Sequence, residues 1–462
     1  MLVTVCLSFS IALARPSDQL ARDASATEVL QSFYHESYGL WDCGLFELGS
    51  STIGGWWNCG NSLEALSNAM IYSGNLSHAT AIENTWEKEG STYDRHLSTN
   101  ILDDLQWWGL AWARASEAVG DAKYLHRSQG FHAKAAEYWD GTCGGGIWWD
   151  RRRSYKNAIV NELFLTLSMR LHALTHEHSY LEWGQKAWSW FNSSGMINAD
   201  GLINDGLNSA CQNNGQETWT YNQGVLFGGL VDLYKVQGDT SYLDAACNVA
   251  DATIRYKSSN GILKESCDPD ACSHDSWQFK GIFMRYLGYL ADALPESLQA
   301  KRVAYASFIA RNAASLWTKA RSGAGVIGAA WDGISEAANG VTHTSGLDCL
   351  NADLLLMGTP VSTGYSLLGQ GNCHPNRPQW SRAGGVDYQK CQHVCDRAER
   401  CIGLEWDASV STCRIRFLSN RDIASPPDGF FASAGVEGEG FDGVEGSKSA
   451  ACYVKPETYE FI

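Results

Sequence analysis

Apolar residues recur at helical spacing from about residue 25 to residue 360. Two stretches show the pattern most clearly: Ile101, Leu105, Trp108 and Trp112, followed by Ile159, Leu163, Leu167 and Leu171. Steps of three and four residues place apolar side chains on one face of a helix. The pattern therefore predicts a long series of helices that each bury one face.

A short connector is repeated between the helical stretches. It reads Gly-Asp-Ala-Lys-Tyr-Leu from Gly120, His-Ser-Tyr-Leu from His178 and Gly-Asp-Thr-Ser-Tyr-Leu from Gly238. In this pattern glycine ends one helix, Asp or Ser caps the next, and Tyr-Leu begins a new apolar stripe. The tyrosines at positions 124, 180 and 242 are 56 and 62 residues apart, so the repeating unit is a helical hairpin of about 60 residues.

Residues 25–360 have room for five or six such hairpins. We expect an all-α fold, an (α/α)6 toroid with six inner and six outer helices, because a closed ring leaves no apolar face exposed. An open superhelical solenoid is the alternative. A solenoid would require polar capping repeats, whereas the predicted loops carry clusters of aromatic residues and glycine.

The character of the chain changes near residue 360. Residues 361–372 are predicted to form a linker, and residues 373–455 a small α+β module stapled by disulfides. Six cysteines fall within that module: Cys373, Cys391, Cys395, Cys401, Cys413 and Cys452.

Composition limits the classes of partner. The 462 residues are 44% hydrophobic, and their formal net charge is -16 with a pI near 5.2. An acidic chain has no basic patch to bind nucleic acid or an anionic membrane surface. A neutral substrate fits this composition better.

The first 14 residues resemble a signal peptide, an apolar stretch that ends in Ala12-Leu-Ala14. A buried N-terminal helix is the alternative. Secretion agrees with sequons at Asn75 and Asn192 and with the 14 cysteines that remain after cleavage, which could form seven disulfides. The C-terminus lacks a lipid-anchor signal, so the mature protein is expected to be soluble and extracellular or cell-wall associated, without a membrane anchor.

Two adjacent carboxylates, Asp103 and Asp104, stand in an otherwise apolar segment. Burying like charges side by side costs several kcal/mol unless one is protonated, so such a pair indicates function. At the first turn of a helix, the helix dipole would favour one ionised carboxylate, and a Trp-rich wall would keep the other protonated. Glycoside hydrolysis needs such a pair. The alternative is that Asp103 caps the helix and Asp104 is a solvated first-turn residue.

Three clusters have the composition of a carbohydrate site. They begin at Gly54 (Gly-Gly-Trp-Trp), Gly144 (Gly-Gly-Gly-Ile-Trp-Trp-Asp) and Glu217 (Glu-Thr-Trp-Thr-Tyr-Asn-Gln-Gly). Indole faces stack on sugar rings, and amides and carboxylates bind hydroxyls. Each cluster alone could be core packing, but three in the loops of one toroid favour a carbohydrate cleft.

Other chemistry is less well supported. His172, His176 and His178 have spacing that could hold a metal, but histidines also favour helix C-termini, and no metal or cofactor is expected. The segment Cys267–Cys272 resembles a calcium loop only loosely and is better explained as a short disulfide-closed loop. No phosphate-binding loop, nucleophile elbow or dinucleotide fingerprint is present.

From about Trp41 to Leu290 the chain resembles glycoside hydrolase family 76, the endo-α-1,6-mannanases. The matching motifs begin at Asp103 (Asp-Asp-Leu-Gln-Trp-Trp), Cys143, Lys156, Thr218 and Gln278. The resemblance implies an (α/α)6 fold and a retaining mechanism, with Asp103 as nucleophile and Asp104 as acid/base. It also implies that substrate is bound by Asn100, Trp107, Trp149, Lys156, Asn157, Trp219, Tyr221, Asn222 and Lys280.

The C-terminal module resembles a PAN/apple domain through the spacing of Cys391, Cys395 and Cys401 before Ile-Gly-Leu-Glu-Trp406. The resemblance implies the disulfides Cys373–Cys452, Cys391–Cys413 and Cys395–Cys401. It also implies a protein or carbohydrate ligand, which would make the module a targeting appendage. Pure structural stabilisation is the alternative.

Together these features predict a secreted enzyme that hydrolyses α-1,6-linked mannan, or the glycan of a mannoprotein, in fungal or yeast cell walls. Two other functions fit the same residues. A transglycosylase would pass the covalent mannosyl intermediate to a sugar in place of water. A mannan-binding wall protein would have lost catalysis, although the chain retains both aspartates.

Overall fold

The computed structural model describes residues 16–42, 56–90, 100–268, 271–272, 274–335 and 337–358, together with the backbone of the strands between residues 366 and 454. The predicted signal peptide lies outside these residues. The chain divides into two compact units, residues 1–355 and 356–462. Within the described ranges, no helix is both long and apolar enough to cross a bilayer.

The first unit alternates inner and outer helices. The inner helices are α2 (Trp56–Ser73), α5 (Leu102–Val119), α7 (Ala158–Thr175), α9 (Thr220–Gln237), α11 (Ser276–Ala293) and α13 (Gly340–Gly358). The outer helices are α1 (Pro16–Gln31), α3 (Ala79–Gly90), α6 (Ala122–Ala136), α8 (His178–Ser193), α10 (Ser241–Tyr256) and α12 (Gln299–Lys319). Short elements complete the unit: β1 (Tyr34–His35), β2 (Leu40–Trp41), η1 (Thr142–Gly144), β3 (Ser258–Ser259), β4 (Ile262–Leu263) and η2 (Glu296–Leu298).

Burial distinguishes the two layers. The inner helix α9 is buried without interruption from Asn222 to Leu233. The outer helix α10 buries only one stripe, which includes Leu243, Ala246 and Ala250. A helix that is buried on all sides must be surrounded by others, whereas a one-sided helix covers them. The inner helices thus form the core of the unit.

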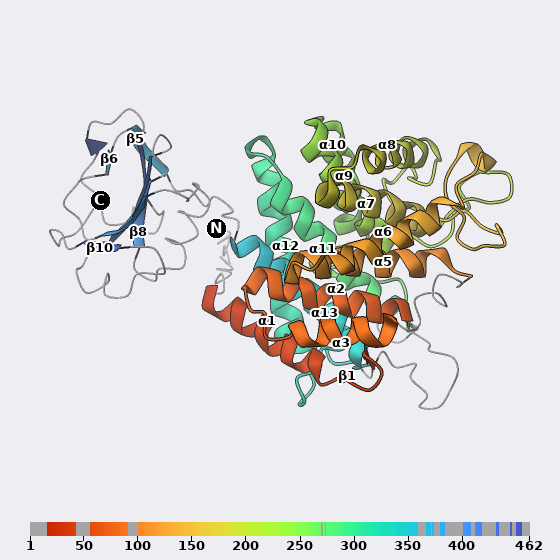
Figure 1. The fold of residues 1–462 in the computed structure, drawn as a ribbon, viewed down its shortest axis with the longest axis horizontal. Helices are drawn as coiled ribbons and strands as arrows, with labels where there is room; N and C mark the ends of the chain where they lie inside the picture. The colour runs from red at the N-terminus through yellow and green to blue at the C-terminus, as the bar shows by residue number, and fades with distance from the viewer. Residues whose placement is uncertain are drawn as a thin grey trace, which may run out of the picture. The chain divides into compact units, whose positions relative to one another are not determined.

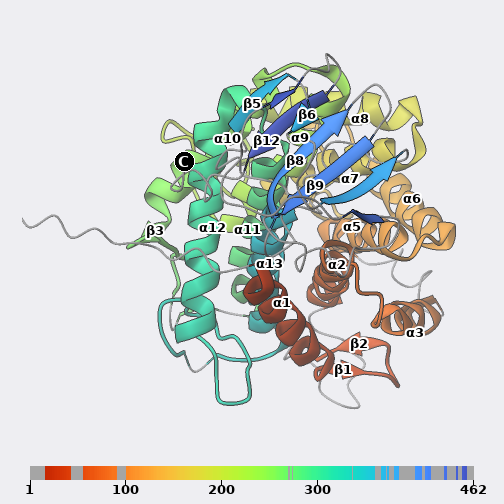
Figure 2. The same ribbon diagram turned by 90° about the vertical axis from the view of Figure 1, so that its left-hand side faces the viewer.

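The helices close into a ring. The Oγ atoms of Ser62 on α2 and Thr344 on α13 are 2.9 Å apart, and the Asn351 amide of α13 donates to the Ala65 carbonyl at 2.8 Å. Figures 1 and 2 show the cyan α13 beside α1 and α2, at the start of the colour sequence. A closed ring agrees with the predicted all-α toroid, and the open solenoid is wrong.

Neighbouring inner helices pack at very short range in places. A Cβ atom added at Gly224 of α9 would lie 2.6 Å from the Cα of Phe283 on α11. Only glycine allows this approach between the two backbones. Gly224 therefore allows the close packing of α9 against α11.

The repeated connectors agree with the prediction only in part, because the N-cap residues of α8 and α10, Glu177 and Thr240, make no side-chain cap. Gly120 and Gly238 end their helices in the left-handed conformation, at φ 76° and 71°. The Asp121 carboxylate accepts a hydrogen bond from the Lys123 amide and caps α6. At the second connector the left-handed residue is His176, at φ 59°, not a glycine. All three connectors are short, so the longer loops gather at the opposite end of the ring, where inner helices begin.

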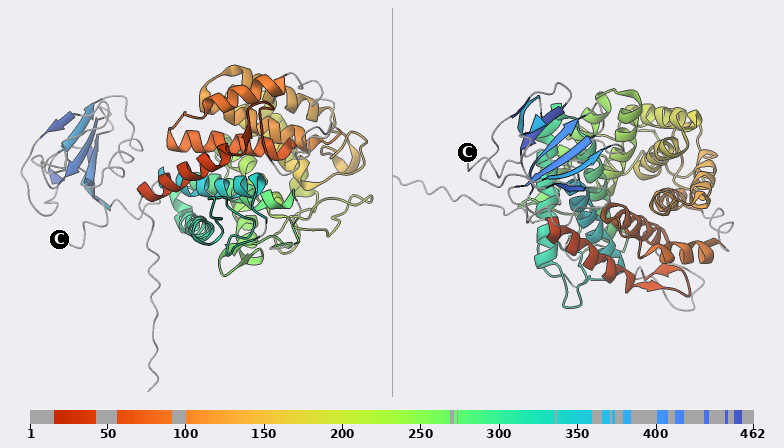
Figure 3. Two further views of the ribbon diagram at one scale, coloured as in Figure 1. Left: turned by 90° about the horizontal axis from the view of Figure 1, so that it is seen from below. Right: turned by 60° about the vertical axis from the view of Figure 1, so that its left-hand side comes forward.

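The second unit contains an antiparallel sheet of six strands in the order β10-β7-β9-β8-β12-β5. Figure 3 shows these strands in blue. Its strands are β5 (Ser366–Gln370), β7 (Gln379–Ala383), β8 (Cys401–Asp407), β9 (Thr412–Phe417), β10 (Phe431–Ser433) and β12 (Ala450–Val454), and β6 (Asn372–Cys373) pairs separately with β11 (Val444–Glu445). In register, Leu404 faces Ile415 and Cys452 faces Glu405. Strand β5 lies inside the stretch that was assigned to a linker. The three predicted disulfides of this unit lie outside the described residues and side chains.

Cysteines of the first unit are only partly paired. Disulfides join Cys267 to Cys272, as predicted, and Cys143 to Cys211. Cys247 and Cys349 are buried thiols. The possibility of seven disulfides is therefore wrong, because these two cysteines pack as small apolar side chains inside helix contacts. The sequon residues Asn75 and Asn192 are both exposed, and their glycosylation stays a prediction.

Candidate active site

The aspartate pair lies at the start of an inner helix. Ile101 is the N-cap of α5 and makes no side-chain cap, while Asp103 and Asp104 occupy the first turn. The helix starts here because the Leu102 amide donates to the Trp149 carbonyl at 2.8 Å, which docks the loop of residues 137–157 onto α5. The interpretation of Asp103 as an N-cap is therefore wrong. Both side chains are only partly exposed.

The two carboxyl groups have unequal surroundings. Burial raises the pKa of Asp103 to about 7, although hydrogen bonds from the Trp149 side chain and from its own and the Asp104 amides oppose this rise. Burial raises the pKa of Asp104 well above its usual range, and the charges of Asp103 and Asp275 raise it further. No hydrogen bond from the described residues opposes this rise in the pKa of Asp104. The pair thus favours a proton on Asp104 and an ionised Asp103.

Aromatic side chains from four inner-helix starts meet beside the pair. We call the following residues the aromatic cluster: Trp57, Trp107, Trp219, Tyr221 and Phe279. Trp107 lies 5.5 Å from Trp57 and 6.4 Å from Tyr221, between ring centroids, and Tyr221 stacks on Phe279 at 3.9 Å. Trp57, Trp219 and Tyr221 are partly exposed, so their faces can stack on a sugar ring.

A cavity adjoins the aromatic cluster at Trp219. Its volume is about 630 Å³, and its wall is rich in amide and carboxyl groups: Asn204, Asp205, Gly215, Gln216, Glu217, Thr218 and Trp219. The Tyr155 hydroxyl donates to the Asp205 carboxylate at 2.6 Å, which fixes one side of this wall. An aromatic face next to many hydroxyl partners suits a carbohydrate.

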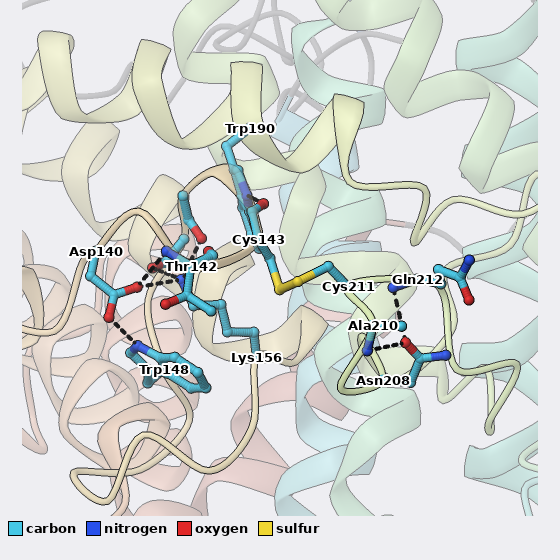
Figure 4. The surroundings of a disulfide bond; sticks show 12 residues. Asp140, Thr142, Cys143, Trp148, Lys156, Trp190, Asn208, Ala210, Cys211 and Gln212 are labelled. Carbon is cyan, nitrogen blue, oxygen red and sulfur yellow. Dashed lines mark hydrogen bonds and ion pairs between the residues drawn. A yellow bond between two sulfur atoms is a disulfide. The ribbon is translucent and has the colours of Figure 1, made fainter.

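Lys156 holds the loop beside the pair together. Its buried ammonium donates to the Asp140 carboxylate at 2.9 Å and to the carbonyls of Thr142, Gly145 and Gly146 at 2.5 to 3.0 Å (Figure 4). Because these four acceptors use its donors, Lys156 positions the loop that carries Trp149. The run of three glycines lets backbone carbonyls approach one ammonium.

The Cys143–Cys211 disulfide ties this loop to the loop of residues 194–219 (Figure 4). The Trp190 indole of α8 donates a hydrogen bond to the Cys143 carbonyl at 3.0 Å and so holds the linked loops against this helix. The first loop carries Trp149, and the second carries Asp205 and Trp219. Two walls of the candidate site are thus covalently coupled.

Replacing both Cys143 and Cys211 by serine is expected to lower the free energy of unfolding by roughly 4 kcal/mol, because the bond spans 68 residues. The matched control is the double serine variant at Cys267 and Cys272, whose bond spans 5 residues. That variant should lose only about 2 kcal/mol, because a short closed loop restricts the unfolded chain less. Urea unfolding measures both values. Equal losses would show that loop length does not govern the stabilisation.

Four other residues were predicted to bind substrate: Asn100, Asn157, Asn222 and Lys280. The Asn100 carbonyl accepts from the Arg151 amide at 3.0 Å, and Asn157 caps α7. Asn222 is fully buried, and neither polar atom of its side chain has a hydrogen-bond partner in the described part of the chain. Lys280 is buried, with Asp268 as ion-pair partner and the Ala329 carbonyl as acceptor at 2.7 Å. Asn157, Asn222 and Lys280 are buried and so present no polar group on the surface of the site, whereas substrate binding by the partly exposed Asn100 stays a prediction.

Sequence reasoning missed two residues of the site, Asp275 and Phe279, and named Trp57 only within a cluster. Phe279 lies inside the matched motif that begins at Gln278, and Asp275 lies three residues before it, so this proximity was the available signal. The three histidines form no metal centre: His176 ends α7, and His172 hydrogen-bonds the Glu177 carbonyl at 3.0 Å. No cluster of three metal-ligating side chains occurs among the residues described.

Solved structures share this fold. The α-1,6-mannanase GH76A from Salegentibacter sp. HEL1_6 superimposes with a TM-score of 0.64 at 24% identity, over 73% of this chain and 100% of that one. Dfg5 from Chaetomium thermophilum gives a TM-score of 0.65 at 18% identity, over 75% of this chain and 92% of that one. These similarities support the helical toroid.

Sequence relatives include the mannan endo-1,6-alpha-mannosidases DCW1 of Candida glabrata, 25% identical over 57% of this chain, and DFG5 of Candida albicans, 29% identical over 52%. The chain spans 65% and 59% of the lengths of these two relatives. The model of glycosyl hydrolase family 76 matches residues 19–363, which is most of the chain. This protein therefore belongs to glycosyl hydrolase family 76.

Proposed function

We propose that this protein is a retaining endo-α-1,6-mannosidase that hydrolyses mannan. The observation that carries the proposal is the pair Asp103 and Asp104 at the first turn of α5, with unequal proton affinities and an aromatic wall. Two carboxyl groups, one ionised and one protonated, are the machinery of glycoside hydrolysis with retention. No cofactor is required for this chemistry.

In the first step, the ionised Asp103 attacks the anomeric carbon and forms a glycosyl ester. Asp104 gives its proton to the glycosidic oxygen as the bond to the leaving sugar breaks. First-turn amides and Trp149 stabilise the Asp103 carboxylate, which is the form that must attack. The enclosed position of Asp104 keeps its proton available until that moment.

In the second step, the ionised Asp104 takes a proton from water. The resulting hydroxide attacks the anomeric carbon, and Asp103 leaves as a carboxylate. The partly exposed indoles of Trp57 and Trp219 would stack on mannosyl units on either side of the broken bond, and the cavity beyond Trp219 would hold further units.

The comparisons support this substrate. The two relatives named above are mannan endo-1,6-alpha-mannosidases. A Salegentibacter α-1,6-mannanase variant with two consecutive aspartates changed to asparagine is described as inactive and is in complex with α-1,6-mannotriose. Both observations agree with a paired-aspartate site that acts on an α-1,6-mannan backbone.

Digestion of linear α-1,6-mannan, with products separated by size, tests the proposal. We expect a series of short mannooligosaccharides early in the reaction, because an endo-acting enzyme cleaves internal bonds of the chain. Release of mannose alone would contradict endo action, and undiminished mannan without any product would contradict catalysis. With an added mannosyl acceptor, products longer than the starting oligosaccharide would identify transglycosylation instead.

The pH dependence of kcat/KM should reflect the ionisation of Asp103 and Asp104. Because the pKa of Asp103 is raised to about 7, activity should fall as the pH drops below about 7 and the nucleophile becomes protonated. Activity should fall again at high pH, where Asp104 loses its proton. Since the two carboxyl groups interact, the apparent pKa values of the two limbs of the pH profile describe the pair and not either residue alone. Full activity at pH 4 would contradict this assignment.

Secretion, a signal peptide at residues 1–14 and glycosylation at Asn75 and Asn192 are part of the same proposal. The domain boundaries, 25–360 for the catalytic part and 373–455 for a PAN/apple-like module, also remain proposals. The module assignment rests on cysteine spacing. A targeting role can be tested by measuring how well two proteins bind insoluble mannan: the full chain and a chain truncated after residue 360.

A further inference from the structure

A third carboxylate, Asp275, lies at the candidate site. It is the N-cap residue of α11, but its side chain makes no cap to that helix. Instead, its Oδ1 atom accepts a hydrogen bond of 2.9 Å from the Trp57 indole of α2. An aspartate at an N-cap ordinarily binds the free amides of its own helix. This side chain is therefore directed toward a partner on another inner helix.

Trp57 connects Asp275 to the helix that carries the catalytic pair. The ring centroid of Trp57 lies 5.5 Å from that of Trp107, which follows Asp104 by three residues on α5. The ring centroid of Trp57 also lies 6.3 Å from that of Phe279 of α11. The indole is thus held between α5 and α11, and its N–H fixes the carboxylate of Asp275 on the same end of the ring as the pair.

Among the residues that the structure describes, the charges that act on the pair are acidic. Asp275 from α11 raises the pKa of both Asp103 and Asp104 through its charge, after the larger effect of burial. Tyr221 from α9 lies within reach of the charges of Asp103, Asp275, Asp205 and Glu162, the last of which comes from α7. The charges that act on Asp104 are those of Asp103 and Asp275, both negative.

We propose that Asp275, held by the Trp57 indole, is a positioning residue whose negative charge keeps the catalytic proton on Asp104. The inference rests on the proposed glycosidase function. A general acid beside an ionised nucleophile must not lose its proton before substrate arrives, and a fixed third carboxylate opposes that loss. Asp275 is exposed, so solvent ions should weaken its influence.

The D275N variant tests the proposal while keeping an oxygen that can accept from Trp57. At low ionic strength, both limbs of the pH profile of kcat/KM should move to lower pH, by several tenths of a unit or more. The difference from the unchanged protein should shrink at about 1 M salt, where the Debye length is about 3 Å. The control is D239N, which removes another exposed carboxylate, from the connector between α9 and α10 at the other end of the ring, and should leave both limbs in place.

A W57F variant gives a second reading. Loss of the indole N–H frees Asp275, so the limbs should move in the same direction as in D275N but less far. A higher KM for D275N with both limbs unmoved would overturn the proposal, because Asp275 would then act only as a substrate contact. Equal shifts for D275N and D239N would also overturn it, because the effect would then be one of net charge.

A readout without substrate separates this proposal from the proposed function. Groups whose pKa is raised by folding stabilise the protein most below the pKa of the unfolded chain, and that stability is lost as the pH rises toward the folded value. The Tm should therefore fall between pH 4 and pH 8 because of Asp103 and Asp104, and should fall less in D275N. An unchanged Tm difference would contradict the influence of Asp275, and absence of mannan cleavage alone would contradict only the enzymatic assignment.

Discussion

Replacing either Asp103 or Asp104 by asparagine is expected to lower kcat on α-1,6-mannan by at least about a thousandfold. Asparagine keeps the shape of each side chain but cannot attack the anomeric carbon or transfer the proton. An activated leaving group should separate the roles, because it needs no acid for its departure. In the first step D104N should then regain much of its rate, whereas D103N should remain inactive.

Both variants should fold. Folding raises the pKa of each aspartate, so the folded protein loses stability as the pH rises and these carboxyl groups ionise. Asparagine does not ionise and avoids this loss. We therefore expect the Tm of D103N and D104N to exceed that of the unchanged protein at pH 8 but not at pH 4. The control is D239N, an exposed aspartate in the connector between α9 and α10. Near-normal turnover in either active-site variant would show that its assignment is wrong.

Replacing Arg285 by methionine is expected to cost about 3 to 5 kcal/mol of unfolding free energy, the second large effect. Arg285 of α11 is buried and pairs with Glu64 of α2 and Asp348 of α13, each at 2.7 Å. It also donates to the Asn61 side chain at 2.9 Å. Its removal leaves two enclosed carboxyl groups without their cation, at the point where the ring of inner helices closes.

Urea unfolding would measure this loss, with R311M on the exposed face of α12 as the matched control. The pKa of Asp348 is raised to about 6 by burial, against the opposing effect of Arg285. The R285M/D348N double variant should therefore recover part of the stability, because one unpaired charge is gone. If R285M is too unstable to purify, D348N alone should still be destabilised. A loss below about 1 kcal/mol in R285M would contradict the importance of this closure.

Much of the fold follows from local sequence rules. Ile159, Leu163, Leu167 and Leu171, predicted from their spacing, are all buried on α7. Connectors at Gly120 and Gly238 end helices in the predicted conformation because glycine reaches positive φ without strain. The same rules allowed the start of α5 to be anticipated, since two carboxylates favour a first helical turn.

The site was predicted only in part, because its other members come from distant segments. Lys156 and Lys280 were predicted to bind substrate, but each ammonium group is buried and donates hydrogen bonds to acceptors of the protein itself. No local pattern indicates that Asp275 leaves its own helix uncapped to accept from Trp57, 218 residues away. The partner of Cys143 was equally undetermined, since spacing does not specify which of many cysteines will meet.

The sequence by itself determined the helical hairpins, the position of the aspartate pair at a helix start and the family resemblance, because periodicity, capping and motif residues act over a few positions. Tertiary structure alone decided which loops meet above that helix, which carboxylates lie close enough to raise one another's pKa and which lysines are buried. Those properties depend on distances between segments that are far apart in the chain. The sequence makes Asp103 and Asp104 neighbours, but their different affinities for a proton result from the residues that surround them in the folded protein.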